Sequence, residues 1–456
     1  MKKKISVSIN KKINKYNKTI KVASDKSLSI RALILASQCI GISKIRNLLE
    51  SEDVLNCIKA LKKLGTKIIK KNNIYFVYGN GLNSFKTNKK LIKIYVGNSG
   101  TTARLLSGLL STQNSKFYLY GDKSMNKRDM SRVIEPLEKI GCFFYPKKKS
   151  TLPLIIEGTS MPLAQKHVEK KGSAQIKSLI LLSGLSTPGI TTIEEKKNSR
   201  DHTEIFLKKI NADIKIKKLK KGNLITLKGQ KNLYAFNYTI FSDPSSASFL
   251  IALTLLTPSS KLIIKDVICN STRVGFLKIL KEKMNANIKI KNLKKFSGEP
   301  VGDIIIKSSI LKPVVCPKEL GPFLIDEFCI LFVIAALTKG ISKFTGINEL
   351  RHKESDRIKN MEGGFNKIGI KTKSTKDSLK IYGNPKVKIK KILNIFSDGD
   401  HRIAMSWTIL GLILGGKLKI HNFETVNTSF PNFIKLIKSI GGKIEIKKKL
   451  KKENFV

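Results

Sequence analysis

One polar-to-apolar pattern occurs six times along this chain, and an internal repeat of this kind constrains the fold more than any other sequence feature. In each copy, a short polar stretch, here called an opener, leads directly into an apolar stretch. The markers of the six openers lie 74, 73, 72, 81 and 75 residues apart; they are Lys26, Gly100, Ser173, Ser245, Asp326 and His401. At 456 residues the chain exceeds one ordinary core, so we expect two domains of three units each.

Each copy predicts the same order of elements. The apolar stretch after the opener predicts a helix, and a strand, a second helix and further strands follow it. The opening helices are apolar nearly all round, which is typical of helices buried inside a domain. The sequence therefore predicts an α/β fold of six βαβαββ units, with helices inside and sheets outside. We assign residues 23–242 to one domain, and residues 1–22 with 243–456 to the other.

Both ends of the chain carry separate expectations. Residues Ile5–Val22 alternate between polar and apolar, which predicts a strand. Because this strand has no earlier helix to accompany, we expect it to close onto the C-terminal half. We expect the lysine-rich tail, Lys447–Lys452, to be frayed.

The openers are suited to binding anions. Their Ser and Asp residues cap the first free N–H groups of a helix, and the remaining donors can hold a negative ligand. Lysine or arginine lies in or beside most of them. The residues expected to face a common region include Lys26, Ser27, Arg31, Asn98, Gly100, Thr101, Ser173, Gln175 and Arg402. A single opener could be only a helix cap, but six alike predict a substrate with two phosphates and carboxylates.

The net charge of +54 raises the alternative of a nucleic-acid-binding protein. Of the 87 basic residues, however, only ten are arginine and 77 are lysine, and the lysines occur in every segment. Aromatic residues make up only 7% of the chain, although nucleic-acid surfaces often combine them with arginine. We interpret the charge as a compositional drift toward lysine and expect no nucleic-acid partner.

The scarcity of arginine gives weight to the few that are present. Lysine already supplies bulk charge here, whereas only arginine offers a planar, bidentate donor fork. Seven arginines lie in or beside the polar motifs: Arg31, Arg104, Arg128, Arg200, Arg351, Arg357 and Arg402. We interpret them as ligand-binding residues, with chance and surface salt bridges as the alternative.

Three further stretches are dense in charged or polar side chains. Glu349–Arg357 alternates cations and carboxylates, with a solvated loop as the alternative interpretation. Asp326 and Glu327 precede the most apolar helix, where a carboxylate among cations can act as a general base. Ser199–Glu204 opens another helix, although Asp201 and Thr203 could form only a capping box. No zinc-binding spacing, P-loop or dinucleotide fingerprint is present, so we expect no metal.

Taken in order, these motifs resemble the EPSP synthase family, the 3-phosphoshikimate 1-carboxyvinyltransferases. The match covers nearly the whole chain, and Glu349–Arg357 is its most specific part. The matching segments also include Lys26–Arg31, Gly97–Arg104, Gly121–Arg128, Ser173–Gln175, Ser199–Glu204, Asp243–Ala247, Asp326–Glu327, Asp400–Met405 and Ser429–Pro431. The resemblance implies two inside-out α/β barrel domains with the active site in the cleft between them.

The resemblance also implies roles for individual residues. Asp326 is expected to be the base, and Glu354, helped by Lys26, the proton donor. Shikimate 3-phosphate is expected to bind Lys26, Ser27, Arg31, Ser173, Ala174, Gln175, Arg200, Asp326 and Lys353. Phosphoenolpyruvate (PEP) is expected to bind Lys26, Gly100, Arg128, Gln175, Arg357 and Arg402. No cofactor is implied, and we expect a monomer.

Four positions depart from the family pattern: Asp25 replaces Ser, Asp129 replaces Pro, Ala174 replaces a Ser of some members, and Thr428 replaces a Lys of some members. Of these, Asp25 could weaken the affinity for anions. The runner-up is the UDP-N-acetylglucosamine enolpyruvyl transferase family, which carries Lys-Asn at the first opener and usually a reactive loop cysteine. Neither feature is present here. Family members with Ala at position 100 tend to tolerate glyphosate, so Gly100 predicts sensitivity.

The sequence also bears on the compartment. Its six cysteines are scattered without CxxC spacing, which is typical of reduced thiols. The longest apolar run, Phe328–Leu337, is ten residues and too short to cross a bilayer. No signal-peptide core follows the N-terminal lysines. We therefore expect a cytoplasmic enzyme without a membrane partner.

Overall fold

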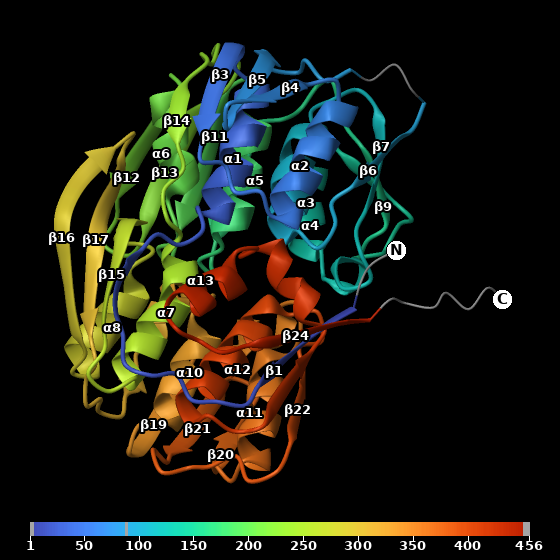
Figure 1. Ribbon diagram of the computed structural model, residues 1–456. Helices are drawn as coiled ribbons and strands as arrows, with labels where there is room; N and C mark the ends of the chain where they lie inside the picture. The colour runs from blue at the N-terminus through green and yellow to red at the C-terminus, as the bar shows by residue number, and fades with distance from the viewer. Residues whose placement is uncertain (1–3, 87–89, 450–456) are drawn as a thin grey trace. The chain divides into compact units, whose positions relative to one another are not determined.

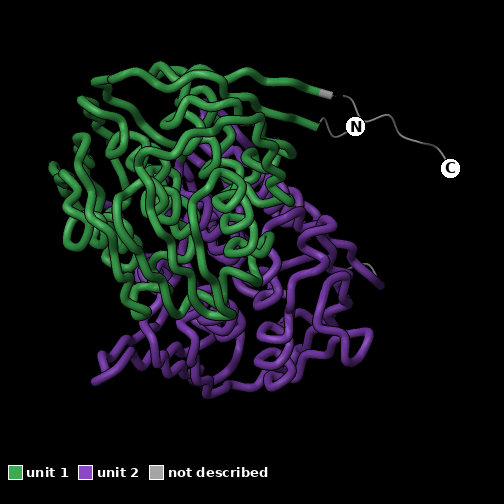
Figure 2. The backbone as a smooth tube through the Cα atoms, turned by 90° about the horizontal axis from the view of Figure 1, so that it is seen from below, with its two compact units in different colours: residues 1–23, 242–295, 300–456 green, residues 24–241, 296–299 purple. Residues whose placement is uncertain are grey.

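The computed structural model describes residues 4–86 and 90–449, and it separates into two compact units (Figures 1 and 2). Unit 1 comprises the residues up to Ala23, Ser242–Lys295 and the residues from Pro300 onward. Unit 2 comprises Ser24–Phe241 and Phe296–Glu299. Both units are built from the same repeated arrangement of strands and helices.

Unit 2 contains three four-stranded sheets, ordered β14-β3-β5-β4, β6-β7-β9-β8 and β10-β11-β13-β12. In each sheet the first two strands are parallel and the remaining pairs are antiparallel. The strands are β3 (Ile40–Arg46), β4 (Lys67–Lys71), β5 (Ile74–Asn80), β6 (Ile92–Tyr95), β7 (Lys116–Tyr120), β8 (Phe143–Tyr145), β9 (Leu154–Glu157), β10 (Lys166–Glu169), β11 (Ile190–Glu195), β12 (Asp213–Lys218), β13 (Asn223–Lys228) and β14 (Asn237–Thr239). Because β14 pairs with β3, the last strand of the unit completes the first sheet.

Three helices of unit 2 form its interior: α1 (Lys26–Ser37), α3 (Gly100–Leu110) and α5 (Ala174–Gly184). Nearly all of their residues are buried, as expected for helices that are apolar all round. Each begins at a polar N-cap whose side chain accepts a backbone N–H; these caps are Asp25, Ser99 and Ser173. The second helices are α2 (Glu52–Lys63), α4 (Ser131–Glu138) and α6 (His202–Lys209).

Unit 1 repeats this plan with sheets ordered β16-β17-β15-β2, β18-β19-β21-β20 and β22-β23-β1-β24. Its strands are β1 (Lys4–Ile9), β2 (Asn17–Ile20), β15 (Lys261–Ile268), β16 (Asn287–Phe296), β17 (Glu299–Lys307), β18 (Val315–Cys316), β19 (Gly340–Thr345), β20 (Thr372–Ser374), β21 (Ser378–Gly383), β22 (Leu393–Phe396), β23 (Leu418–His421) and β24 (Glu445–Lys449). Its inner helices are α7 (Pro244–Leu256), α10 (Phe328–Ala336) and α12 (His401–Leu414). The other helices are α8 (Gly275–Lys283), α9 (Gly321–Leu324), α11 (Arg357–Lys367) and α13 (Phe433–Ser439). The predicted fold of six units with inner helices and outer sheets is confirmed.

The N-terminal segment joins unit 1, but not as one strand. β1 pairs with β23 and β24, and β2 pairs with β15, which confirms closure onto the C-terminal half. The prediction of a single strand over Ile5–Val22 is wrong, because residues 10–16 separate two strands that enter different sheets. The prediction of a frayed tail is wrong for Lys447–Lys449, which pair with β1; residues 450–452 lie outside the described part of the chain.

Across residues 4–86 and 90–449, no helix combines the length and apolar character needed to cross a membrane. None of the six cysteines is paired in a disulfide, and five of them are buried. The buried thiols agree with the interpretation of the cysteines as reduced core residues.

Candidate active site

Lys26 begins α1 and is held by a carboxylate of α2. Its Nζ lies 2.8 Å from Oδ2 of Asp53, and 17% of the Lys26 side chain is exposed. The preceding residue, Asp25, is buried and accepts the backbone N–H of Leu28 at 2.7 Å. The departure from serine at position 25 therefore preserves the helix cap and directs the carboxylate into the helix end.

Arg31 connects α1 to two other helices of unit 2. Its Nε donates to the Thr203 hydroxyl at 2.9 Å, and its guanidinium also donates to Oγ of Ser178 and to the carbonyl of Ser27. The Thr203 hydroxyl also lies 2.6 Å from Oγ of Ser178. At the start of α6, the Asp201 side chain accepts no capping hydrogen bond from the helix. The alternative interpretation of this segment as a capping box is not supported.

The opener of α3 places Arg128 beside Gly100. Arg128 donates to the side-chain carbonyl of Asn98 at 2.8 Å, and Asn98 donates in turn to Asp122 at 2.8 Å. A Cβ built on Gly100 would lie 2.9 Å from one guanidinium nitrogen of Arg128 and 3.5 Å from one of Arg104. The left-handed φ of +60° in this turn belongs to Gly97, and Gly100 does not adopt such a conformation. Gly100 thus leaves space next to two guanidinium groups rather than relieving backbone strain.

The opener of α5 is joined to the opener of α3 through Gln175. The Gln175 amide donates to the Thr101 hydroxyl at 2.9 Å, and Arg104 donates to the Gln175 side-chain carbonyl. Ser173 caps the helix, and Ala174 is its first residue. The N-termini of α3 and α5 therefore meet, so their free N–H groups and nearby guanidiniums can act on one ligand. Arg200 lies in the segment between β11 and α6.

In unit 1, Arg357 is fully buried and bound to two carboxylates. Its Nε donates to Asp400 at 2.8 Å, a terminal nitrogen donates to Glu354 at 2.8 Å, and another donates to the Ile325 carbonyl at 3.2 Å. Burial alone would lower the pKa of Arg357, but the charges of Asp400 and Glu354 outweigh it and raise the pKa. Lys353 directly precedes Glu354 in the turn between a 3-10 helix and α11.

Arg402 is buried but uses little of its donor capacity within the protein. One terminal nitrogen lies 3.9 Å from Oδ1 of Asp326, and the guanidinium lies 6.0 Å from the ring centroid of Phe249. Its buried Nε has no hydrogen-bond partner among the described residues. Because an unsatisfied buried donor is costly, this arrangement is typical of a group that binds an anionic ligand.

Several structural partners of these residues were missed at the sequence level. Asp53 and Asp400 hold Lys26 and Arg357, and only Asp400 had a signal, because it lies in an opener. Conversely, the interpretation of Arg351 as a ligand-binding arginine is not supported. Its side chain donates to Asp356 and to the carbonyls of Thr375 and Lys376, so it braces a loop.

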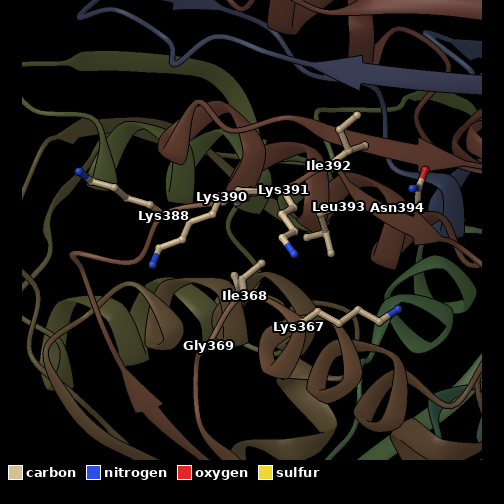
Figure 3. A pocket seen from close by; sticks show the side chains of 10 residues that line it. Lys367, Ile368, Gly369, Lys388, Lys390, Lys391, Ile392, Leu393 and Asn394 are labelled. Atoms are coloured by element: carbon tan, nitrogen blue, oxygen red, sulfur yellow. The ribbon is translucent and has the colours of Figure 1, made fainter.

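A cavity of about 640 Å³ lies elsewhere in unit 1 (Figure 3). It is lined by Lys367 at the end of α11, by Ile368 and Gly369 after that helix, and by Lys388–Asn394 before and within β22. None of the predicted site residues contributes to it, and its four lysines agree with the lysine content of the whole chain. We therefore do not assign the active site to this cavity.

Comparison with known proteins identifies one family. The family model described as EPSP synthase (3-phosphoshikimate 1-carboxyvinyltransferase) matches residues 10–437. A 3-phosphoshikimate 1-carboxyvinyltransferase of Endomicrobium trichonymphae is 40% identical over 431 residues, which cover 94% of this chain and 98% of the relative. One from Petrotoga mobilis is 41% identical, covering 93% of this chain and 97% of the relative.

Solved structures show the same likeness. EPSP synthase from Acinetobacter baumannii superposes with a TM-score of 0.83 at 37% identity, covering 97% of this chain and 100% of that chain. The enolpyruvyl transferase NikO from Streptomyces tendae has a TM-score of 0.77 at 12% identity, covering 98% of this chain and 100% of that chain. At that identity the second likeness concerns the fold alone.

Proposed function

The chain belongs to the EPSP synthase family, and from this premise we propose that it is a 3-phosphoshikimate 1-carboxyvinyltransferase. It transfers the enolpyruvyl group of PEP to the 5-hydroxyl of shikimate 3-phosphate and releases phosphate, a step of aromatic amino acid biosynthesis. The alternatives of a UDP-N-acetylglucosamine enolpyruvyl transferase and of a nucleic-acid-binding protein are not favoured, because the matched family and the two relatives described above are named for 3-phosphoshikimate 1-carboxyvinyltransferase activity.

Shikimate 3-phosphate is proposed to bind mainly residues of unit 2. The joined openers of α3 and α5 and the Arg31 network supply helix N-termini, hydroxyls and guanidiniums suited to a phosphate. The proposed set is Lys26, Ser27, Arg31, Ser173, Ala174, Gln175 and Arg200 from unit 2, with Asp326 and Lys353 from unit 1. The departure at Ala174 removes a hydroxyl but retains the backbone N–H.

PEP is proposed to bind Arg402 above all. The buried, unsatisfied guanidinium of Arg402 is the observation on which the proposed PEP site rests. The Arg402 guanidinium is buried, its Nε has no hydrogen-bond partner among the described residues, and Asp326 lies 3.9 Å away, beyond hydrogen-bond distance. The guanidinium therefore keeps donors that a small dianion or trianion can use. The remaining proposed contacts are Lys26, Gly100, Arg128, Gln175 and Arg357. Gly100 leaves space beside Arg128 for such a ligand.

The chemistry requires one base and one acid. We assign Asp326 to accept the proton of the 5-hydroxyl, since its side chain is 26% exposed and lies beside Arg402. We assign Glu354, with Lys26, to protonate the methylene carbon of PEP. Arg357 donates to Glu354 in the structure, and a ligand carboxylate bound to Arg357 would compete for that donor.

The steps balance without a metal or an organic cofactor. Protonation of the methylene makes C2 of PEP cationic, and the deprotonated 5-oxygen forms a C–O bond to it. The tetrahedral intermediate then loses a methyl proton and breaks its C2–O bond to phosphate. An enol ether and inorganic phosphate result, with the surrounding cations stabilising the phosphates throughout.

A coupled phosphate-release assay with the purified protein tests the function. Release is expected only when both shikimate 3-phosphate and PEP are present, with a product mass equal to their sum minus phosphoric acid. Release with UDP-N-acetylglucosamine in place of shikimate 3-phosphate would overturn the proposal. We also propose that the enzyme works as a cytoplasmic monomer, for which light scattering after size-exclusion chromatography should give the mass of one chain.

A further inference from the structure

Lys177 is an exception in this lysine-rich chain. Among the lysines that the structure describes, it alone is buried, with 1% of its surface exposed. Transferring an ammonium group out of water costs several kcal/mol, so a buried lysine needs strong compensation. A chain that places its other described lysines at or near the surface has no compositional reason to bury this one.

Two buried carboxylates provide the compensation. The Lys177 Nζ lies 2.8 Å from Oε1 of Glu195 and 2.7 Å from Oε1 of Glu204. Burial would lower the pKa of Lys177, but the charges of Glu204 and Glu195 outweigh it, so the pKa is raised and the ammonium stays charged. Oε2 of Glu204 has no hydrogen-bond partner among the described residues. Apolar side chains of the same volume would often stabilise a protein as much as such a charged cluster or more. We therefore infer that this cluster serves to fix the positions of the segments that it joins.

The cluster is connected to both ends of the segment that carries Arg200. At one end, Oε1 of Glu195 accepts the backbone N–H of Ser199 at 2.9 Å and its hydroxyl at 2.5 Å. At the other end, Glu204 follows Thr203, whose hydroxyl contacts Ser178 and Arg31. Lys177 lies on the first turn of α5 and joins the two ends through its carboxylate partners.

We propose that Lys177, Glu195 and Glu204 are positioning residues that hold Arg200 near the N-terminus of α5 for the phosphate of shikimate 3-phosphate. This inference rests on the proposed function. The three side chains do not touch the substrate. They act through Arg200 and through the α5 opener, where Ser173 and Ala174 lie.

Two variants test the network. Glu204→Gln is nearly isosteric and retains an oxygen for Lys177, so the fold should be kept. The triple variant Lys177→Met, Glu195→Gln and Glu204→Leu removes all three buried charges and keeps a side-chain oxygen at position 195 to accept from Ser199, so it should melt within a few degrees of the unmodified protein. In both, the Kd for shikimate 3-phosphate is expected to rise about tenfold, whereas the KM for PEP at saturating shikimate 3-phosphate changes less than about twofold.

A double-mutant cycle separates positioning from general stability. Arg200→Met alone should weaken shikimate 3-phosphate binding, and adding Glu204→Gln should weaken it little further, since both act through one group. Val77→Ala is the matched control: Val77 is buried in β5, a strand that packs against α1, and its loss should lower the melting temperature without changing the Kd.

Three outcomes would overturn the proposal. The first is an unchanged Kd in both network variants, and the second is full additivity of Glu204→Gln with Arg200→Met. If the unmodified enzyme turns over both substrates, either of these results would reject the positioning role of the three residues and leave the proposed function intact. The third is an unmodified protein that neither binds shikimate 3-phosphate nor releases phosphate, and it would reject both.

Discussion

Replacing Arg402 by lysine separates charge from geometry at the proposed PEP site. Within the protein, the Arg402 side chain makes only a 3.9 Å ion pair and a contact with the Phe249 ring, so lysine removes no short hydrogen bond from the described part of the folded chain. Arg357→Lys provides the contrast. That guanidinium donates to Asp400, Glu354 and the Ile325 carbonyl, and a single ammonium cannot reach all three.

The two substitutions should therefore differ in size and kind. Losing one charge-assisted hydrogen bond to the ligand costs about 1.5–3 kcal/mol, so Arg402→Lys should lower kcat/KM by roughly 10- to 150-fold with little change in melting temperature. Arg357→Lys leaves the fully buried Asp400 with fewer donors. A cost of about 3 kcal/mol would lower the melting temperature of its unit by roughly 6–12 °C, in addition to the loss of activity.

Steady-state kinetics and calorimetry on the three proteins decide the question. Arg46→Lys is the control, because Arg46 lies exposed on β3 outside every polar motif and should change neither quantity. If Arg402→Lys retained kcat/KM within about twofold, the bidentate role would be wrong. If it melted as early as Arg357→Lys, Arg402 would be a structural residue instead.

Three further predictions follow from single side chains. Asp326→Asn keeps the size of the residue and removes the base, so kcat should fall by about 10²- to 10⁴-fold with folding intact; near-normal turnover would move the role to Glu327 or Glu354. The unmodified enzyme should be sensitive to glyphosate, and Gly100→Ala should raise its inhibition constant more than the KM for PEP, because the new methyl lies close to Arg128. Gly97→Ala, at a left-handed φ, should instead lower the melting temperature and weaken both ligands alike. Burial would raise the pKa of Glu169, but His167, Arg132 and the N–H groups of Lys171 and Ser173 outweigh it and lower the pKa. The stabilisation by Glu169 should thus be complete above about pH 4.3 and vanish as the pH falls through the lower folded-state pKa, so Glu169→Gln should cost about 1–3 kcal/mol at pH 7 and much less at low pH; a loss independent of pH would contradict this.

The repeat, the inner helices and the capped openers could be predicted from the sequence alone. Helix caps and hydrophobic periodicity are interactions among residues a few positions apart, so the pattern around Lys26 or Ser173 contains the information that the helix end needs.

The pairing of charges was decided only by the tertiary structure. Lys26 is 27 residues from Asp53 and Arg357 is 43 residues from Asp400, and nothing local to either cation marks its partner. Arg351 and Arg402 both occur in charged motifs, yet one braces a loop and the other keeps a buried donor unsatisfied among the described residues. Likewise, only the fold separates Ile5–Val22 into two strands and buries Lys177 between Glu195 and Glu204. Such contacts depend on which distant segments pack together and how far they exclude water, and a linear pattern of residues does not specify either quantity.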